Sequence, residues 1–180
     1  TAFLALLGKP FHKKRVILTE RSSQLIFTRN KILNSLLNYV YRDVDKLVVL
    51  SNASKNYLIK RYKNVRPVVI QNGVNFSKTK KFFYKDKFRK KIGINKNKKV
   101  VLYVGRLTSL KCLEYLLRGF SKVKINNKIL ILVGVGEEGD NLKVLARQLD
   151  IEKSIMFVGN VSSEDVYNYM SISDVFVLPS

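Results

Sequence analysis

The chain has 180 residues, of which 46% are hydrophobic and 26% charged, and its 34 basic and 13 acidic residues give a formal net charge of +21. An intrinsically disordered chain is excluded, because such chains lack the apolar side chains that offset the entropy lost on folding. The single cysteine, Cys112, cannot form an internal disulfide, so nothing indicates an oxidising compartment. No apolar run approaches the roughly 20 residues of a membrane-spanning helix.

The excess positive charge lies in the first part of the sequence. Residues 1–99 contain 25 basic and 4 acidic residues, whereas residues 100–180 contain nine of each. The densest run, residues 78–99, has eleven lysines and arginines with one acid, and it follows an Asn72-Gly73 pair that favours a turn. The predicted organisation is two α/β domains and a basic linker between them, at residues 1–71, 99–180 and 72–98 respectively.

Short apolar runs rich in β-branched residues predict seven strands. In chain order they lie at residues 15–19, 46–50, 67–70, 100–104, 129–133, 154–158 and 175–178. Apolar residues three and four positions apart predict amphipathic helices between them, at residues 32–40, 57–62, 113–123, 142–149 and 166–170. A further apolar stretch at residues 2–7 is interpreted as the end of a buried helix.

This alternation of strands and helices predicts an α/β fold with Rossmann-like parallel sheets. Right-handed crossover connections place helices on both faces of such sheets. Ligands bind beyond the carboxyl ends of the strands, where a loop leads into a helix. The candidate binding loops are therefore residues 105–111, 134–139 and 159–163.

The second of these loops, residues 134–139, matches the G-x-G-x-x-G pattern of dinucleotide-binding proteins. A nicotinamide cofactor is nevertheless rejected. No acid for the ribose follows the next strand, at residues 157–160, and Glu137 and Glu138 would bring negative charge to a helix start meant for a pyrophosphate. The pattern is interpreted as a tight turn between a strand and a helix.

The first loop places two cations, Arg106 and Lys111, on either side of a turn that leads into a helix. Gly105 precedes them and allows close approach of the backbone to a ligand. This arrangement suits a diphosphate. Two solvated surface cations are the alternative, and spacing alone does not decide between these readings.

Neither a metal site nor a cysteine nucleophile is expected. The only histidine, His12, has no partner at the spacing of metal ligands. A cysteine nucleophile needs a histidine as its base, and the chain has none besides His12. Cys112 is therefore expected to be a small, partly buried structural residue.

Five segments together resemble the family 4 retaining glycosyltransferases, whose GT-B architecture has two Rossmann-like domains facing each other across a cleft. The segments keep the order and approximate spacing of that family. They resemble its motifs V-I-P-N-G-V-D, Y-V-G-R-L with a following K-G, L-x-V-G-x-G, F-x-G-x-V and A-D-x-F-V-L-P-S, and lie at residues 68–75, 103–111, 131–137, 157–161 and 173–180.

The resemblance implies transfer of a sugar, with retention, from a nucleotide-diphosphate sugar to a glycan or lipid-linked acceptor in the synthesis of cell-surface polysaccharide or glycolipid. Arg106 and Lys111 would be the catalytic residues, because they would neutralise the departing diphosphate without a metal or cofactor. The loop after the sixth predicted strand would lie against the base. The implied donor-binding residues are Gly105, Arg106, Lys111, Gly134, Gly136, Gly159, Asn160 and Val161.

Several positions depart from the family pattern. Cys112 stands where the family usually has glycine, and Gln71 and Asn75 replace its proline and aspartate. Arg21 stands near a histidine position of many relatives, and with Glu20 it forms the candidate acceptor-side pair. The resemblance also implies that the chain is an internal fragment of an enzyme about twice as long, and that this fragment alone does not turn over.

The excess of positive charge is compatible with several kinds of binding partner. A basic stripe with interleaved aromatic residues can bind nucleic acid, and a nucleic-acid-binding protein without enzymatic activity is the alternative function. No nucleic acid is expected, because the motif-rich half is neutral and no recognition module is visible. An anionic inner membrane surface would suit a cytoplasmic enzyme with a lipid-linked acceptor, at about 1 kcal/mol for each well-placed lysine or arginine. A compositional bias toward lysine is the remaining interpretation.

Overall fold

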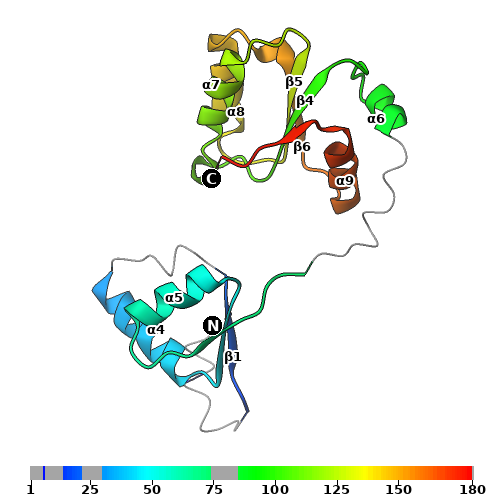
Figure 1. Cartoon of the computed structure of the whole chain (residues 1–180). Helices are drawn as coiled ribbons and strands as arrows, with labels where there is room; N and C mark the ends of the chain where they lie inside the picture. Colours follow the sequence, from blue (N-terminus) through cyan, green and yellow to red (C-terminus); the bar gives the residue numbers. More distant parts are fainter. Residues whose placement is uncertain (1–5, 7–13, 22–29, 74–84, 180) are drawn as a thin grey trace. The chain divides into compact units, whose positions relative to one another are not determined.

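The computed structural model describes residue 6 and residues 14–21, 30–73 and 85–179. The chain forms two compact units, Thr1–Val74 and Asn75–Ser180 (Figure 1). The predicted helix end at residues 2–7 lies outside the described residues except for Leu6, which is buried in the first core. His12 and Asn75 also lie outside them.

The first unit is built on a three-stranded parallel sheet. Its strands are β1 (Ile17–Glu20), β2 (Lys46–Val49) and β3 (Pro67–Val69), in the order β1-β2-β3. Two helices connect them, α4 (Lys31–Asp43) and α5 (Asn52–Arg61). Each connection is a β-α-β crossover between neighbouring parallel strands, as the alternating pattern predicts.

Polar side chains at the helix starts and apolar side chains inside fix this unit. The side-chain oxygen of Asn30 accepts from the backbone N–H groups of Ile32 and Leu33 at 3.0 and 3.1 Å and so caps α4. Ser51 caps α5 by accepting from the N–H of Ser54 at 3.1 Å. The core is apolar and is centred on Leu37, Val40, Tyr41, Leu47, Val49, Leu58 and Tyr62.

The second unit is built on a four-stranded sheet in which every strand pair is parallel. Its strands are β4 (Lys99–Val104), β5 (Lys128–Val133), β6 (Ile155–Gly159) and β7 (Val175–Phe176). Their order is β6-β5-β4-β7. Since the central strands β4 and β5 pair along their whole length, they form a rigid base for the loops that follow them.

Helices cover both faces of this second sheet. They are α6 (Lys85–Lys91), α7 (Leu113–Lys122), α8 (Gly139–Gln148) and α9 (Ser163–Ile172). Alternate residues of β5 point to opposite faces: Leu130 and Leu132 pack in a core with residues of α7 and α8, whereas the neighbouring isoleucines pack in a core with residues of α6 and α9. The strands are therefore apolar on both sides, which is why they read as continuous apolar runs.

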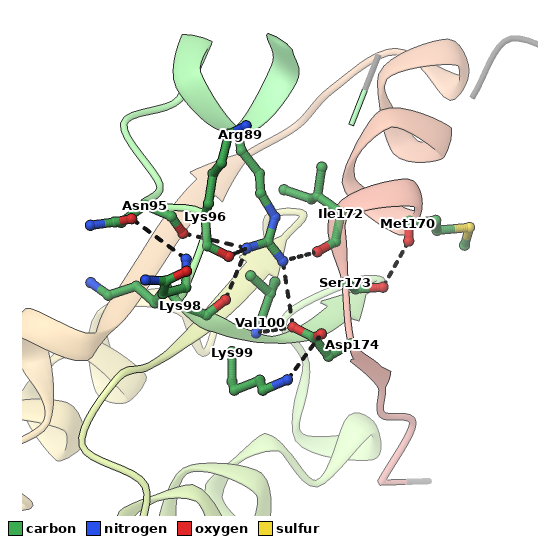
Figure 2. Close-up of polar contacts among 11 residues, drawn as sticks. Arg89, Asn95, Lys96, Lys98, Lys99, Val100, Met170, Ile172, Ser173 and Asp174 are labelled. Carbon is green, nitrogen blue, oxygen red and sulfur yellow. Dashed lines mark hydrogen bonds and ion pairs between the residues drawn. The ribbon is translucent and has the colours of Figure 1, made fainter. Parts of the chain in front are cut away.

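The segment just before β4 belongs to the second unit. Arg89 of α6 is 3% exposed, and its guanidinium donates to the carbonyl oxygens of Lys96, Lys98 and Ile172 at 3.0, 2.9 and 2.7 Å (Figure 2). It also contacts a carboxylate oxygen of Asp174 at 3.4 Å. The structure thus differs from the predicted linker at residues 72–98, because residues 85–98 pack into the second unit.

The misassigned segment also changes where the charge lies. Residues 1–74 hold 14 basic and 3 acidic residues, and residues 75–180 hold 20 and 10. Each unit therefore carries about half of the net charge. Within the second unit the excess is confined to residues 75–99, which hold eleven basic residues and one acid.

Candidate functional site

The loops that follow β4 and β5 are bound to each other at the carboxyl edge of the second sheet. The N–H of Gly105 donates to the carbonyl oxygen of Val133 at 2.9 Å, and that of Leu107 donates to Val135 at 3.0 Å. The carbonyl of Leu107 accepts from the N–H of Glu138 at 2.9 Å. The first loop is thus held at three points, one by the end of β5 and two by the second loop.

Glycines permit this close packing of backbone on backbone. A Cβ atom added to Gly134 would overlap the carbonyl oxygen of Gly105, and one added to Gly136 would overlap that of Leu107. Gly134 also has a φ of +133° and donates its N–H to the carbonyl of Gly159 at 2.8 Å. The G-x-G-x-x-G pattern is therefore a tight turn, as interpreted, and its glycines support the first loop.

A cavity of about 490 Å³ opens beside these glycines. It is bounded by all three loops and by the first turn of α8. Three candidate donor-binding residues line it: Gly134, Gly136 and Gly159. Asp140 and Lys143 of α8 lie at its wall and form an ion pair of 2.9 Å, which lowers the pKa of Asp140.

The two candidate catalytic cations stand on the first loop. Arg106 is exposed, and Lys111 is half-buried at the end of the short 3-10 turn Ser109–Lys111. Within the part of the chain that the structure describes, neither forms an ion pair with a carboxylate. Neither borders the 490 Å³ cavity, nor do Asn160 and Val161. The structure thus divides the candidate residues between the cavity wall and the adjoining loops.

Cys112 joins that 3-10 turn to α7 in an unusual conformation. Its φ and ψ are 51° and 34°, in the left-handed region that glycine adopts without a steric penalty. The side chain is half-buried and provides no cap for α7. The left-handed backbone conformation explains why the family that the chain resembles usually has glycine at this position.

Two residues of this region were not among the candidate site residues. Tyr103 of β4 is fully buried, and its hydroxyl donates to the carbonyl oxygen of Arg106 at 2.8 Å. Burial raises the pKa of Tyr103. Thr108 is 7% exposed, and its hydroxyl oxygen has no hydrogen-bond partner among the described residues. The sequence signal for Tyr103 is its place as the first residue of the Y-V-G-R-L segment, two residues before Gly105.

The candidate acceptor-side pair lies at the end of β1 in the first unit. Glu20 is 8% exposed, and its carboxylate accepts a hydrogen bond of 2.7 Å from the hydroxyl of Tyr41. Burial and this contact raise the pKa of Tyr41. Glu20 is thus bonded to a residue of the first core, and its contact with an acceptor stays a prediction. Arg21 is exposed, and its contact with an acceptor stays a prediction.

Among the described residues, no group of three or more histidine, cysteine, aspartate or glutamate side chains is placed to hold a metal ion. Within the same residues, no helix has both the length and the apolar character needed to span a membrane.

Solved structures share the fold of this chain. The crystal structure of Anabaena HepE in complex with UDP matches with a TM-score of 0.84 and 18% identity, over 97% of this chain and 49% of HepE. The predicted α/β fold with Rossmann-like parallel sheets is thereby confirmed.

The family model for glycosyl transferases group 1 matches residues 84–180, more than half of the chain, and the chain belongs to this family. An uncharacterised glycosyltransferase of Methanocaldococcus jannaschii is 35% identical over 62% of this chain and 30% of its own length. The Escherichia coli UDP-Gal:alpha-D-GlcNAc-diphosphoundecaprenol alpha-1,3-galactosyltransferase is 32% identical over 75% of this chain and 36% of its own length. The chain thus spans half or less of these relatives.

Proposed function

We propose that this chain carries the donor-binding loops of a family 4 retaining glycosyltransferase that transfers a hexosyl group from a nucleotide-diphosphate sugar. The observation that carries the proposal is the first loop of the second unit. It presents Arg106 and Lys111 without an ion-pair partner among the described residues, beside a cavity walled by glycines. A diphosphate is the ligand whose charge these two cations match.

In this proposal the cavity at Gly134, Gly136 and Gly159 holds the nucleoside part of the donor. Glycine backbone without side chains gives a planar base and a ribose room to lie against the loops. Asn160 and Val161 would contact the base through their backbone groups. The UDP bound in the crystal structure of HepE, which has the same fold, supports a uridine nucleotide as the first donor to test.

The proposed chemistry is electrostatic. The bond between the anomeric carbon and the diphosphate oxygen breaks, and the nucleoside diphosphate leaves with the bonding electrons. The acceptor oxygen bonds to the same carbon, on the face from which the diphosphate left, and its proton passes to an oxygen of the departing diphosphate. Arg106 and Lys111 would stabilise the negative charge that develops on the leaving group, a task that a metal ion performs in other enzymes.

The proposed acceptor is a glycan or a lipid-linked sugar used in the synthesis of polysaccharide or glycolipid. The Escherichia coli relative has a lipid diphosphate acceptor in its name, which supports this class. The net charge of +21 supports a peripheral contact with an anionic membrane surface on the cytoplasmic side, since each well-placed cation contributes about 1 kcal/mol there.

The donor site is tested by calorimetric titration of the full-length protein with UDP, GDP and ADP. We expect Arg106→Ala combined with Lys111→Ala to weaken binding of the preferred nucleotide at least about tenfold, because charged hydrogen bonds are lost. The matched control is Lys124→Ala combined with Lys153→Ala, which removes two exposed cations from the opposite end of the sheet. Equal affinities in both double variants would overturn the assignment.

A further inference from the structure

The hydroxyl of Tyr103 lies beneath the loop that carries Arg106. We propose that Tyr103 is a positioning residue, which fixes the backbone of Arg106 so that its guanidinium can meet the donor diphosphate. This inference rests on the proposed function. Its basis is the hydrogen bond of 2.8 Å from the Tyr103 hydroxyl to the carbonyl oxygen of Arg106.

The ring of Tyr103 is a rigid support for that hydroxyl. It is fully buried between the sheet and helices α7 and α8, in the same core cluster as Leu107, Leu117, Leu130 and Leu132. The side chain cannot change rotamer without displacing these residues. A buried hydroxyl also needs a hydrogen-bond partner, and the Arg106 carbonyl supplies it. Burial raises the pKa of Tyr103, so the hydroxyl keeps the proton that it donates.

Gly105 makes this contact sterically possible. A Cβ atom at position 105 would lie 2.6 Å from the hydroxyl oxygen of Tyr103 and 3.0 Å from the ring carbon that bears it. Both distances are shorter than van der Waals contact. The tyrosine, the glycine two residues later and the arginine three residues later therefore form one structural unit.

This unit fixes each backbone position around Arg106. The N–H groups of the residues on either side are also held. That of Gly105 donates to Val133, the last residue of β5, at 2.9 Å, and that of Leu107 donates to Val135 of the second loop at 3.0 Å. The carbonyl of Arg106 itself is fixed only through Tyr103 among the described contacts. Because the guanidinium is exposed at the end of a flexible side chain, a fixed backbone reduces the conformational freedom that binding must remove.

The test is Tyr103→Phe in the full-length protein, with calorimetric titration of UDP and UMP. Phenylalanine keeps the ring in the core and removes only the hydroxyl. We expect UDP affinity to fall about three- to tenfold, as for the loss of one neutral hydrogen bond, and UMP affinity to fall less. The control is Tyr115→Phe, which removes the hydroxyl of an exposed tyrosine on α7.

A second experiment asks whether Tyr103 acts through Arg106. In the Arg106→Ala background the carbonyl remains but the guanidinium is gone, so Tyr103→Phe should cause no further loss of UDP affinity. The same fold-loss in both backgrounds would overturn the proposal and leave Tyr103 a merely structural residue. Unchanged UDP binding by Tyr103→Phe alone would overturn it while the proposed function stands. Failure of the wild-type protein to bind UDP, GDP or ADP would overturn both.

Discussion

Different interactions hold the two ends of the strands in the second sheet, the amino edge where the strands begin and the carboxyl edge where they end. At the amino edge, the guanidinium of Arg89 joins α6, the residues before β4 and the end of α9 through carbonyl oxygens (Figure 2). At the carboxyl edge, loops pack backbone on backbone with glycines at the contacts, and Arg106 and Lys111 form no ion pair with a described carboxylate.

This difference separates stability from binding. A buried cation that donates several hydrogen bonds is fully committed to the fold, because removing it leaves carbonyl groups without partners. Cations that form no ion pair with the described carboxylates remain available for an anionic ligand. Arg89 and Arg106 have the same side chain, and only their surroundings give them different roles. The two edges can therefore be altered separately.

The largest expected effect is at the amino edge. Arg89→Ala should lower the free energy of unfolding of the second unit by about 3–5 kcal/mol, because the carbonyl oxygens of Lys96, Lys98 and Ile172 lose their charged donor. Urea unfolding measured by circular dichroism, with amide hydrogen exchange to locate the loss, checks this. Lys91→Ala, an exposed residue of the same helix, should change the free energy by less than about 0.5 kcal/mol. Similar values for the two variants would contradict the assigned role.

The next effect is at the carboxyl edge. Gly134→Ala should cost about 2–4 kcal/mol and weaken UDP binding, because the new methyl group overlaps the Gly105 carbonyl at a φ of +133°. Thermal unfolding and calorimetric titration measure the two losses. The control is Gly119→Ala in α7, where nothing lies within 4 Å of the new atom and the helix should gain up to about 1 kcal/mol. Retention of full UDP affinity in Gly134→Ala would separate this glycine from the donor site.

The sequence predicts the strands well because parallel strands are apolar on both faces. All seven predicted strands occur, with ends shifted by two residues at most. The positions of the candidate loops could also be predicted from the sequence, since a glycine after an apolar run predicts a turn at the carboxyl edge of the sheet. This part of the fold depends on local patterns that a single sequence contains.

The burial of polar side chains could not be predicted from the sequence in the same way. Arg89 stands in a run of lysines and arginines, and the apolar Phe88, Ile92 and Ile94 beside it were the only signal that this segment packs. Glu20, a candidate acceptor-side residue, is buried and accepts a hydrogen bond from Tyr41, a contact that the sequence did not predict. Which polar group is buried depends on partners far along the chain, such as Ile172 for Arg89, and local spacing does not predict them.

A smaller effect is expected where the first loop enters α7. Cys112→Gly should raise the free energy of unfolding by about 0.5–1 kcal/mol, because glycine removes the steric cost of φ 51° although it adds freedom to the unfolded chain. Differential scanning calorimetry measures the shift. Cys112→Ala keeps a Cβ atom and should give no such gain, so it separates backbone strain from the loss of the thiol. Equal stabilities of the glycine and alanine variants would contradict strain at this position.

The smallest effect concerns the acid at the amino edge. A hydrogen bond from the N–H of Val100 at 2.8 Å, with the nearby charges of Lys99 and Arg89, lowers the pKa of Asp174 below its ordinary value of 3.8. The folded state therefore binds this proton less readily than the unfolded state. The resulting stabilisation is fully present above pH 3.8 and is lost as the pH falls through the lower, folded-state pKa.

Asp174→Asn tests this small contribution directly. The wild-type free energy of unfolding should fall more steeply with decreasing pH near and below 3.8 than that of the variant. Urea unfolding at a series of pH values gives both slopes, and Asp86→Asn on α6 controls for the loss of one negative charge. Because about a third of the Asp174 side chain is exposed, solvent screens its charge, and its removal should cost far less than that of Arg89. Parallel pH profiles of wild type and Asp174→Asn would show that the amino edge depends on the arginine alone.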